Sequence, residues 1–190
     1  MDKNNSLILW FDELTIGDVG MVGGKNASLG DMYSNLSGQG IKVPDGFAVT
    51  AHAYQIFLKE AGHEEKIAQI LSSLNKDSIE DLKEKGEEIR QLILSSTIPA
   101  SISESIKDAY RKLCEKYGEN TDVAVRSSAT AEDLPGASFA GEQETFLNIS
   151  GAENLLESVK KCFASLFTDR AISYREDKGF AHMKVYLSVG

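Results

Sequence analysis

Residues 123–149 read VAVRSSATAEDLPGASFAGEQETFLNI, and this stretch decides the fold. The apolar triplet 123–125 predicts a buried strand, and residues 145–149 return to strand-like alternation. Between them, residues 126–141 are small, polar and acidic. Loops longer than about a dozen residues inside compact domains are usually functional or disordered. The stretch therefore predicts a strand–loop–strand unit whose loop carries function.

The residues before this unit predict short strands alternating with helices. Residues 7–11 are apolar and predict a strand, and a glycine cluster at 17–24 precedes a helical period through residue 36. Val-Pro-Asp-Gly at 43–46 predicts a turn, because proline presets φ and glycine accepts a positive φ. Residues 47–49 then predict a strand, followed by a helix with Thr50 as its N-cap.

The charge-rich segment 64–117 predicts two amphipathic helices that act as scaffold. Asp77 with Glu80, and Ser101 with Glu104, have the spacing of capping boxes. After the central unit, residues 151–166 predict another helix, a short helix begins at Asp169, and residues 185–189 predict a last strand. The sequence stops at Gly190 within apparent strand, so we expect it to be part of a longer chain.

Composition places the chain among ordinary globular proteins. Of its 190 residues, 42% are hydrophobic and 26% charged, and the formal net charge is -9. A net negative charge disfavours binding to nucleic-acid phosphates and anionic lipid, so neither nucleic acid nor membrane is an expected partner. Two cysteines cannot form a disulfide framework, which favours a reducing, cytoplasmic setting.

The first candidate site is Gly23-Gly24-Lys25-Asn26, at the predicted start of a helix. Glycines let a backbone approach a phosphate, a helix start offers N–H donors, and lysine supplies a charge. The spacing is not that of a P-loop, because Val19 stands where that motif needs glycine and Asn26 replaces the serine or threonine. A glycine turn with a solvated lysine is the alternative.

Arg126, at the predicted end of a buried strand, is the second candidate and the candidate catalytic residue. Beside hydroxyl side chains it can hold a phosphoryl oxygen and stabilise charge during transfer. In the alternative, Arg126 pairs with Glu132 or Asp133 and only structures the loop.

The third candidate is the returning loop 138–145, which could close over a nucleotide with the Gly141 backbone and the Thr145 hydroxyl near the phosphates. A hairpin with a flexible tip is the alternative. His52, His63 and His182 match no metal-ligand spacing, and surface or capping roles are expected for them.

Three segments, residues 22–32, 43–50 and 124–148, resemble the N-terminal nucleotide-binding domain of the family that includes phosphoenolpyruvate synthase, pyruvate phosphate dikinase and rifampicin phosphotransferase. The resemblance covers essentially all 190 residues. It implies an α+β fold, the N-terminal portion of an ATP-grasp-like domain over residues 1–190, with helices packed on a mixed, mainly antiparallel sheet. It also implies that Lys25, Arg126, Gly141 and Thr145 bind ATP.

The same resemblance implies a phosphotransferase. In that family ATP phosphorylates a histidine on a mobile domain of the same full-length chain, on the way from pyruvate and ATP to phosphoenolpyruvate. The family's Mg²⁺ ligands are expected beyond residue 190, so this stretch alone is expected to bind ATP weakly and to be catalytically silent. Rifampicin phosphorylation, or a stand-alone nucleotide-binding module without catalysis, are the alternatives.

Overall fold

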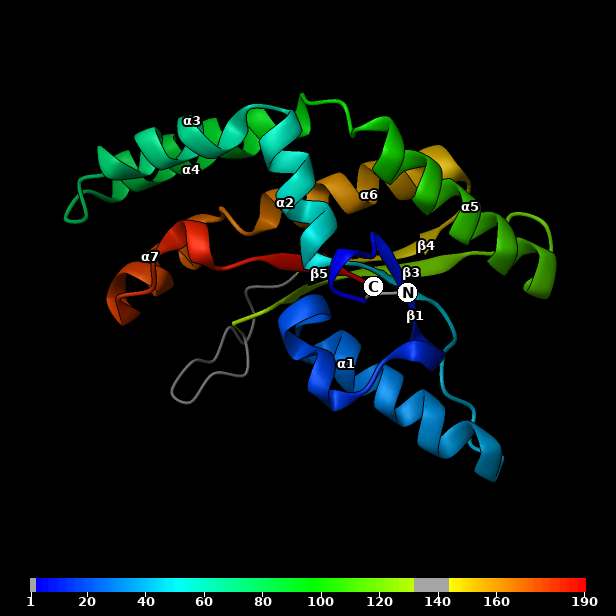
Figure 1. The fold of residues 1–190 in the computed structure, drawn as a ribbon. Helices are drawn as coiled ribbons and strands as arrows, with labels where there is room; N and C mark the ends of the chain where they lie inside the picture. Colours follow the sequence, from blue (N-terminus) through cyan, green and yellow to red (C-terminus); the bar gives the residue numbers. More distant parts are fainter. Residues whose placement is uncertain (1–2, 132–143) are drawn as a thin grey trace.

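The fold is a five-stranded sheet covered by helices, seen in a computed structural model that describes residues 3–131 and 144–190 (Figure 1). The strand order is β1-β2-β5-β3-β4, and each of the four pairings is antiparallel. The strands are β1 (Ile8–Trp10), β2 (Phe47–Val49), β3 (Val123–Ala129), β4 (Thr145–Ile149) and β5 (Leu187–Val189). The expected α+β class with a mainly antiparallel sheet is therefore confirmed.

Helices lie on both faces of the sheet. The helix α1 lies on one face, while α2, α5 and α6 lie on the other, with α3 and α4 stacked farther out (Figure 1). The helices are α1 (Val19–Leu36), α2 (Ala51–Glu60), α3 (His63–Ser72), α4 (Ile79–Leu94), α5 (Ala100–Tyr117), α6 (Ala152–Ser165) and α7 (Asp169–Lys178). Short 3-10 helices are η1 (Lys3–Asn5), η2 (Phe11–Glu13), η3 (Ile16–Asp18), η4 (Ser37–Gln39) and η5 (His182–Lys184).

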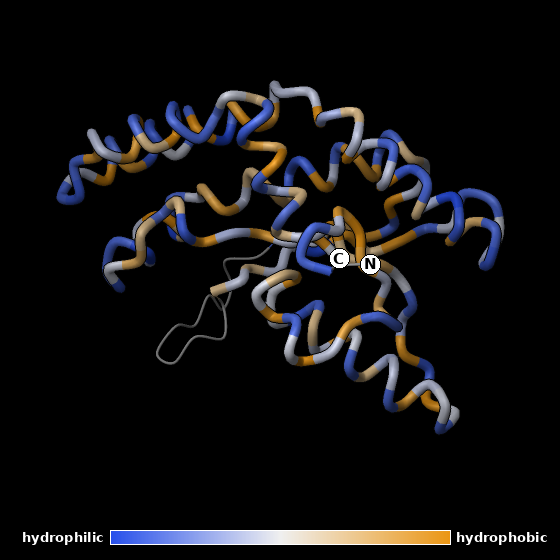
Figure 2. Tube along the Cα trace, viewed as in Figure 1, coloured by the Kyte–Doolittle hydropathy of each residue, from blue (hydrophilic) through white to orange (hydrophobic). Residues whose placement is uncertain are grey.

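Two separate clusters of buried side chains hold these layers together. The larger one lies under α2, α4, α5 and α6, and it includes the tilted ring pair Phe57 and Phe163, whose ring centroids are 5.4 Å apart. The smaller one lies on the α1 side of the sheet and consists of Leu9, Phe11, Leu14, Val22, Ala27 and Ala48. In Figure 2 the outer turn between α3 and α4 is hydrophilic, as expected for a segment far from either cluster. In the described ranges, no helix is long and apolar enough to cross a membrane.

The predicted helix starts are partly right. Thr50 caps α2, because its hydroxyl accepts the N–H of Ala53 at 3.2 Å. The expected cap at Asp77 is wrong, since the hydroxyl of Ser78 accepts the N–H of Asp81 instead. The expected cap at Ser101 is wrong as well, because Pro99 precedes the first turn of α5 and places Ser101 inside the helix. Three helices rather than two occupy residues 63–117.

Arg126 lies within β3 and not at its end, contrary to the prediction. The strand continues to Ala129 because β5, distant in sequence, pairs with residues 127–129. Arg126 itself exchanges two backbone hydrogen bonds with Gly190, at 2.8 and 2.9 Å. The ladder is therefore extended by a partner that local sequence does not reveal.

Candidate functional site

The site begins at a kink in α1. Gly23 has φ 73° and ψ 163°, so α1 consists of two helical segments that meet at this residue. The second segment starts at Gly24 and Lys25, and the first N–H groups of a helix have no partner within it. The glycine pair thus creates a helix start in the middle of what would otherwise be one continuous helix.

Gly23 also packs closely against strand β3 of the sheet. A Cβ atom added to it would fall 2.2 Å from Oγ of Ser128 and 2.6 Å from its carbonyl oxygen. Both the positive φ and this contact with β3 require glycine. The contact brings the new helix start beside the strand that carries Arg126.

Arg126 and Thr145 are placed together by strand pairing. Arg126 on β3 is the register partner of Thr145 on β4. Residues directly opposite in an antiparallel pair project from the same face of the sheet. Arg126 is half-buried and Thr145 is exposed. A guanidinium group and a hydroxyl group therefore share one side of the sheet.

A single cleft of about 1150 Å³ contains all three of these predicted residues. Lys25, with Gly24 and Ser28, forms the α1 side, and Arg126 and Thr145 belong to the sheet side. The segment at residues 41–47 and the end of α5 line the rest of the cleft. The two cationic residues predicted to act together thus open into one shared space.

The remaining predicted loop residues lie outside the described ranges. Gly141 is one of them, and so are Glu132 and Asp133, the acids of the alternative proposed for Arg126. Thr145, at the end of the same loop, is the described member of the third candidate site.

Charges in the cleft favour an anion. Lys25, Lys42 and Arg126 are the cationic residues among the described part of its lining, against Asp45 and Asp122. Asp45 is already compensated, because Lys116 contacts its carboxylate at 2.6 Å and the hydroxyl of Tyr117 donates to it at 2.9 Å. Burial acts to raise the pKa of Asp45, but these hydrogen bonds and that of the Gly46 N–H hold the pKa below its usual value.

The residues of the cleft fit a polyphosphate. Gly24 and Lys25, at the start of the second segment of α1, line the cleft, while Gly23 packs against Ser128 of β3 behind them. Backbone N–H groups, a lysine and an arginine form the usual donor set for phosphate oxygens. The arrangement can therefore bind phosphates and stabilise charge that develops on them.

The same residues do not fit a metal ion by themselves. In residues 3–131 and 144–190, no group of three or more His, Cys, Asp and Glu side chains is arranged to hold one.

Sequence reasoning missed the apolar part of the cleft. Four large hydrophobic side chains that the fold leaves exposed line it: Met32, Ile41, Tyr117 and Leu147, exposed by 44, 51, 53 and 65%. Tyr117 continues the apolar period of α5, yet it is exposed and its hydroxyl donates to Asp45. Helical periodicity alone does not distinguish a core position from one facing a cleft.

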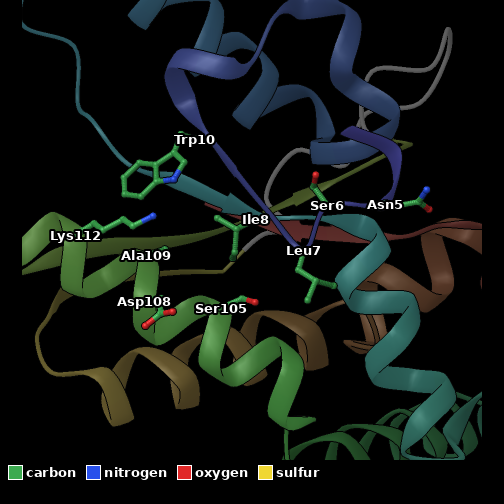
Figure 3. Close-up of a pocket in the computed structure, with 9 residues that line it drawn as sticks. All are labelled: Asn5, Ser6, Leu7, Ile8, Trp10, Ser105, Asp108, Ala109 and Lys112. Carbon is green, nitrogen blue, oxygen red and sulfur yellow. The ribbon is translucent and has the colours of Figure 1, made fainter. Parts of the chain in front are cut away.

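A second hollow, of about 540 Å³, lies between the segment around β1 and α5 (Figure 3). The labelled side chains of Leu7 and Ile8 project from the β1 segment towards α5, which contributes Asp108 and Lys112. None of the predicted site residues lines it. The larger cleft is therefore the candidate site.

His63 is buried, so the surface role expected for it is wrong, whereas His182 is half-buried. His63, at the start of α3, is 8% exposed and contacts the hydroxyl of Ser96. His182 accepts a hydrogen bond at Nδ1 from Nε of Arg175 at 2.9 Å, and its Nε2 lies 2.6 Å from a carboxylate oxygen of Glu176. Both are tied into the fold away from the cleft lining.

Comparison with known proteins gives a family match over nearly the whole chain. The family described as pyruvate phosphate dikinase, AMP/ATP-binding domain, matches residues 19–190. A phosphoenolpyruvate synthase of Aquifex aeolicus is 58% identical over 191 residues, which cover 100% of this chain and 22% of that protein. The phosphoenolpyruvate synthase of Escherichia coli is 49% identical, with 100% of this chain and 24% of that protein covered.

An archaeal relative extends the comparison. A probable phosphoenolpyruvate synthase of Methanocaldococcus jannaschii is 53% identical over 95% of this chain and 15% of its own length. The chain thus spans about a quarter or less of the length of these curated relatives.

Proposed function

The chain belongs to the pyruvate phosphate dikinase AMP/ATP-binding domain family, and from this premise we propose that its cleft binds the phosphates of ATP. Lys25 supplies a point charge, Arg126 a planar pair of N–H donors, and Thr145 a hydroxyl donor. Gly141 is proposed to complete the site through its backbone. The observation that carries the proposal is that Lys25, Arg126 and Thr145 line one cleft although 120 positions separate the first from the last.

We further propose that residues 1–190 are the N-terminal portion of this nucleotide-binding domain. The full-length protein then acts as a phosphotransferase, in which ATP phosphorylates a histidine on a mobile domain of the same full-length chain, and the phosphoryl group passes on to give phosphoenolpyruvate from pyruvate. The names of the relatives support this reaction over rifampicin phosphorylation. Arg126 is the residue proposed to stabilise charge on the transferred group.

The acceptor histidine is not proposed among the histidines of this chain. His63 is buried against Ser96, and half-buried His182 is engaged with Arg175 and Glu176. Mg²⁺ belongs to the proposal because phosphoryl transfer needs its charge, which it supplies when bound with ATP. A cytoplasmic setting is proposed as well, consistent with the two free cysteines, Cys114 and Cys162.

The test is a titration of the isotopically labelled chain with ATP, with and without MgCl₂, followed by amide chemical shifts. The largest shifts are expected at Gly24, Lys25, Arg126 and Thr145, with saturation at millimolar concentrations. Shifts confined to the hollow beside β1, or none at all, would refute the nucleotide site.

The reaction is tested separately, with the protein produced from its own gene. Formation of phosphoenolpyruvate from pyruvate and ATP is the expected result. ATP binding without that product would instead indicate the binding module without catalysis.

A further inference from the structure

A buried chain of hydrogen bonds joins α1 to the centre of the sheet. Asn26 is 1% exposed and Ser188, on β5, is 0% exposed. Nδ2 of Asn26 donates to Oγ of Ser188 at 3.1 Å, and Oγ of Ser188 donates to the carbonyl oxygen of Val49 on β2 at 2.7 Å. A hydroxyl has one proton to donate, so the direction of both bonds is fixed.

One end of this chain adjoins the first cation of the cleft. Asn26 follows Lys25 directly in the second segment of α1. Because Asn26 points into the protein and is held there, the backbone turn that carries Lys25 is held with it. The Lys25 side chain leaves the adjacent position and lines the cleft.

The other end adjoins the second cation. Gly190 follows β5 directly and exchanges both of its backbone hydrogen bonds with Arg126. A Cβ atom added to Gly190 would fall 2.2 Å from Oδ1 of Asn26, so the Asn26 amide packs directly against this backbone. Asn26 is therefore linked to both cations. It is the chain neighbour of Lys25, and it packs against Gly190, which pairs with Arg126.

We propose that Asn26 and Ser188 are positioning residues, which hold Lys25 and Arg126 at a fixed separation that suits the phosphates of the bound nucleotide. The inference rests on the proposed function of the cleft. Asn26 borders the cleft but is only 1% exposed, and its amide donates to Ser188, so the role assigned to it is positioning rather than ligand contact.

Packing alone does not account for this pair. Burying an amide and a hydroxyl costs desolvation that their mutual hydrogen bond does little more than offset, so two apolar side chains would fill the same space equally well. The polar pair fixes the position of α1 along β5, because the geometry of a hydrogen bond between two buried side chains tolerates little sliding of one element past the other.

The test compares ATP affinity among Asn26→Ala, Ser188→Ala and the double variant. Each single substitution is expected to weaken binding by about three- to tenfold, the loss that corresponds to one hydrogen bond. The double variant is expected to lose no more ATP affinity than the single variant with the larger loss, because the two substitutions remove the same hydrogen bond. Additive losses, or wild-type affinity in either single variant, would overturn the proposal.

Ser158→Ala is the matched control. Ser158 on α6 is also buried, 4% exposed, and its hydroxyl also donates to a backbone carbonyl, that of Asn154 at 2.8 Å. We expect it to lower thermal stability without changing ATP affinity. If Ser158→Ala weakened ATP binding as much as Ser188→Ala, the loss would reflect general destabilisation and the positioning role would be refuted.

A readout without nucleotide separates this inference from the proposed function. In the nucleotide-free protein, Ser188→Ala is expected to shift the amide resonance of Lys25, and Asn26→Ala that of Arg126. Failure of the wild-type chain to bind ATP would refute the proposed function, while these shifts would still test the link. Wild-type binding with neither shift would refute the link alone.

Discussion

Arg126 on β3 lies directly opposite Thr145 on β4, and both side chains open into the cleft that Lys25 borders from α1. The strand pairing fixes the relation of the first two residues, and the helix start at Gly24 fixes that of the third. Binding of a polyphosphate would thus depend on two independent pieces of local geometry, which substitutions can test one at a time.

Arg126→Ala is expected to weaken ATP binding without unfolding the protein. A hydrogen bond to a charged group is worth about 1.5–3 kcal/mol, so we expect a loss of about tenfold or more in affinity. Isothermal titration calorimetry measures the affinity, and the thermal midpoint should stay within a few degrees of wild type. The control is Arg111→Ala, which removes an exposed arginine paired with Asp108. A large fall in thermal midpoint for Arg126→Ala would instead support the alternative in which this arginine only structures the fold.

Lys25→Ala is expected to weaken ATP binding and to make it less sensitive to salt. A lysine attracts phosphate oxygens as a point charge, and that attraction is screened as ionic strength rises. Affinity is measured between low and moderate salt, with Lys107→Ala as the control, since Lys107 pairs with Glu153 on the surface. Equal affinity and an equal salt slope for Lys25→Ala and wild type would remove Lys25 from the site.

Gly23→Ala is expected to destabilise the protein, whereas Gly20→Ala in the same helix is expected to stabilise it. At Gly23 a side chain meets a positive φ and a contact of 2.2 Å with Ser128, and strain of this kind costs about 1–3 kcal/mol. At Gly20 nothing lies within 4 Å of the added atom. Alanine there should add about 0.5–1 kcal/mol to the free energy of unfolding. Chemical denaturation measures both, and a tolerated Gly23→Ala would contradict the close approach of α1 to β3.

Stability is expected to fall as the pH drops below about 6.5, because folding lowers the pKa of two histidines. Burial and the nearby charge of Arg175 lower the pKa of His182 from its usual 6.5, against the opposing effect of Glu176. Burial and Lys66 lower the pKa of His63.

As the pH falls, the histidines of the unfolded chain therefore take up protons before those of the folded protein. The contribution of the two histidines to the free energy of unfolding is complete above pH 6.5 and is lost as the pH falls towards their folded pKa values. Besides Arg175 and Glu176 of α7, Lys76 from the α3–α4 connection faces His182 through its ion pair with Glu176. The free energy of unfolding between pH 5 and 8 is the measurement. His63→Asn/His182→Asn should flatten the slope between pH 5 and 6.5, and an unchanged slope would contradict the assignment.

Local patterns in the sequence predict much of this fold. The cap at Thr50 and the helix predicted at 151–166 follow from capping chemistry and apolar spacing, and the structure confirms them. The turn predicted at 43–46 is wrong, because residues 41–46 have no turn and Gly46 is not among the glycines with a positive φ. The other errors arise where the partner is distant. The length of β3 depends on β5, and the start of α5 depends on Pro99 rather than on the Ser101–Glu104 spacing.

The site shows the same division. Lys25 and Arg126 are residue types suited to phosphate, and their sequence neighbours single them out. That they share one cleft is a tertiary fact, created by the Gly23 contact with Ser128 and by the pairing of Gly190 with Arg126. Asn26 carried no signal beyond its place next to Lys25, because its partner Ser188 is 162 positions away.

The smaller cluster of buried side chains has a dynamic consequence. The α1 layer is held by Leu9, Phe11, Leu14, Val22, Ala27 and Ala48, while α6 lies within a far larger cluster. Segments with fewer buried contacts open more often by local unfolding. Backbone amides of α1 should therefore exchange with deuterium sooner than those of α6. A nucleotide bound between Lys25 and Arg126 should slow the exchange of α1 selectively. The exchange rate of this one helix would then report how much of the protein has nucleotide bound.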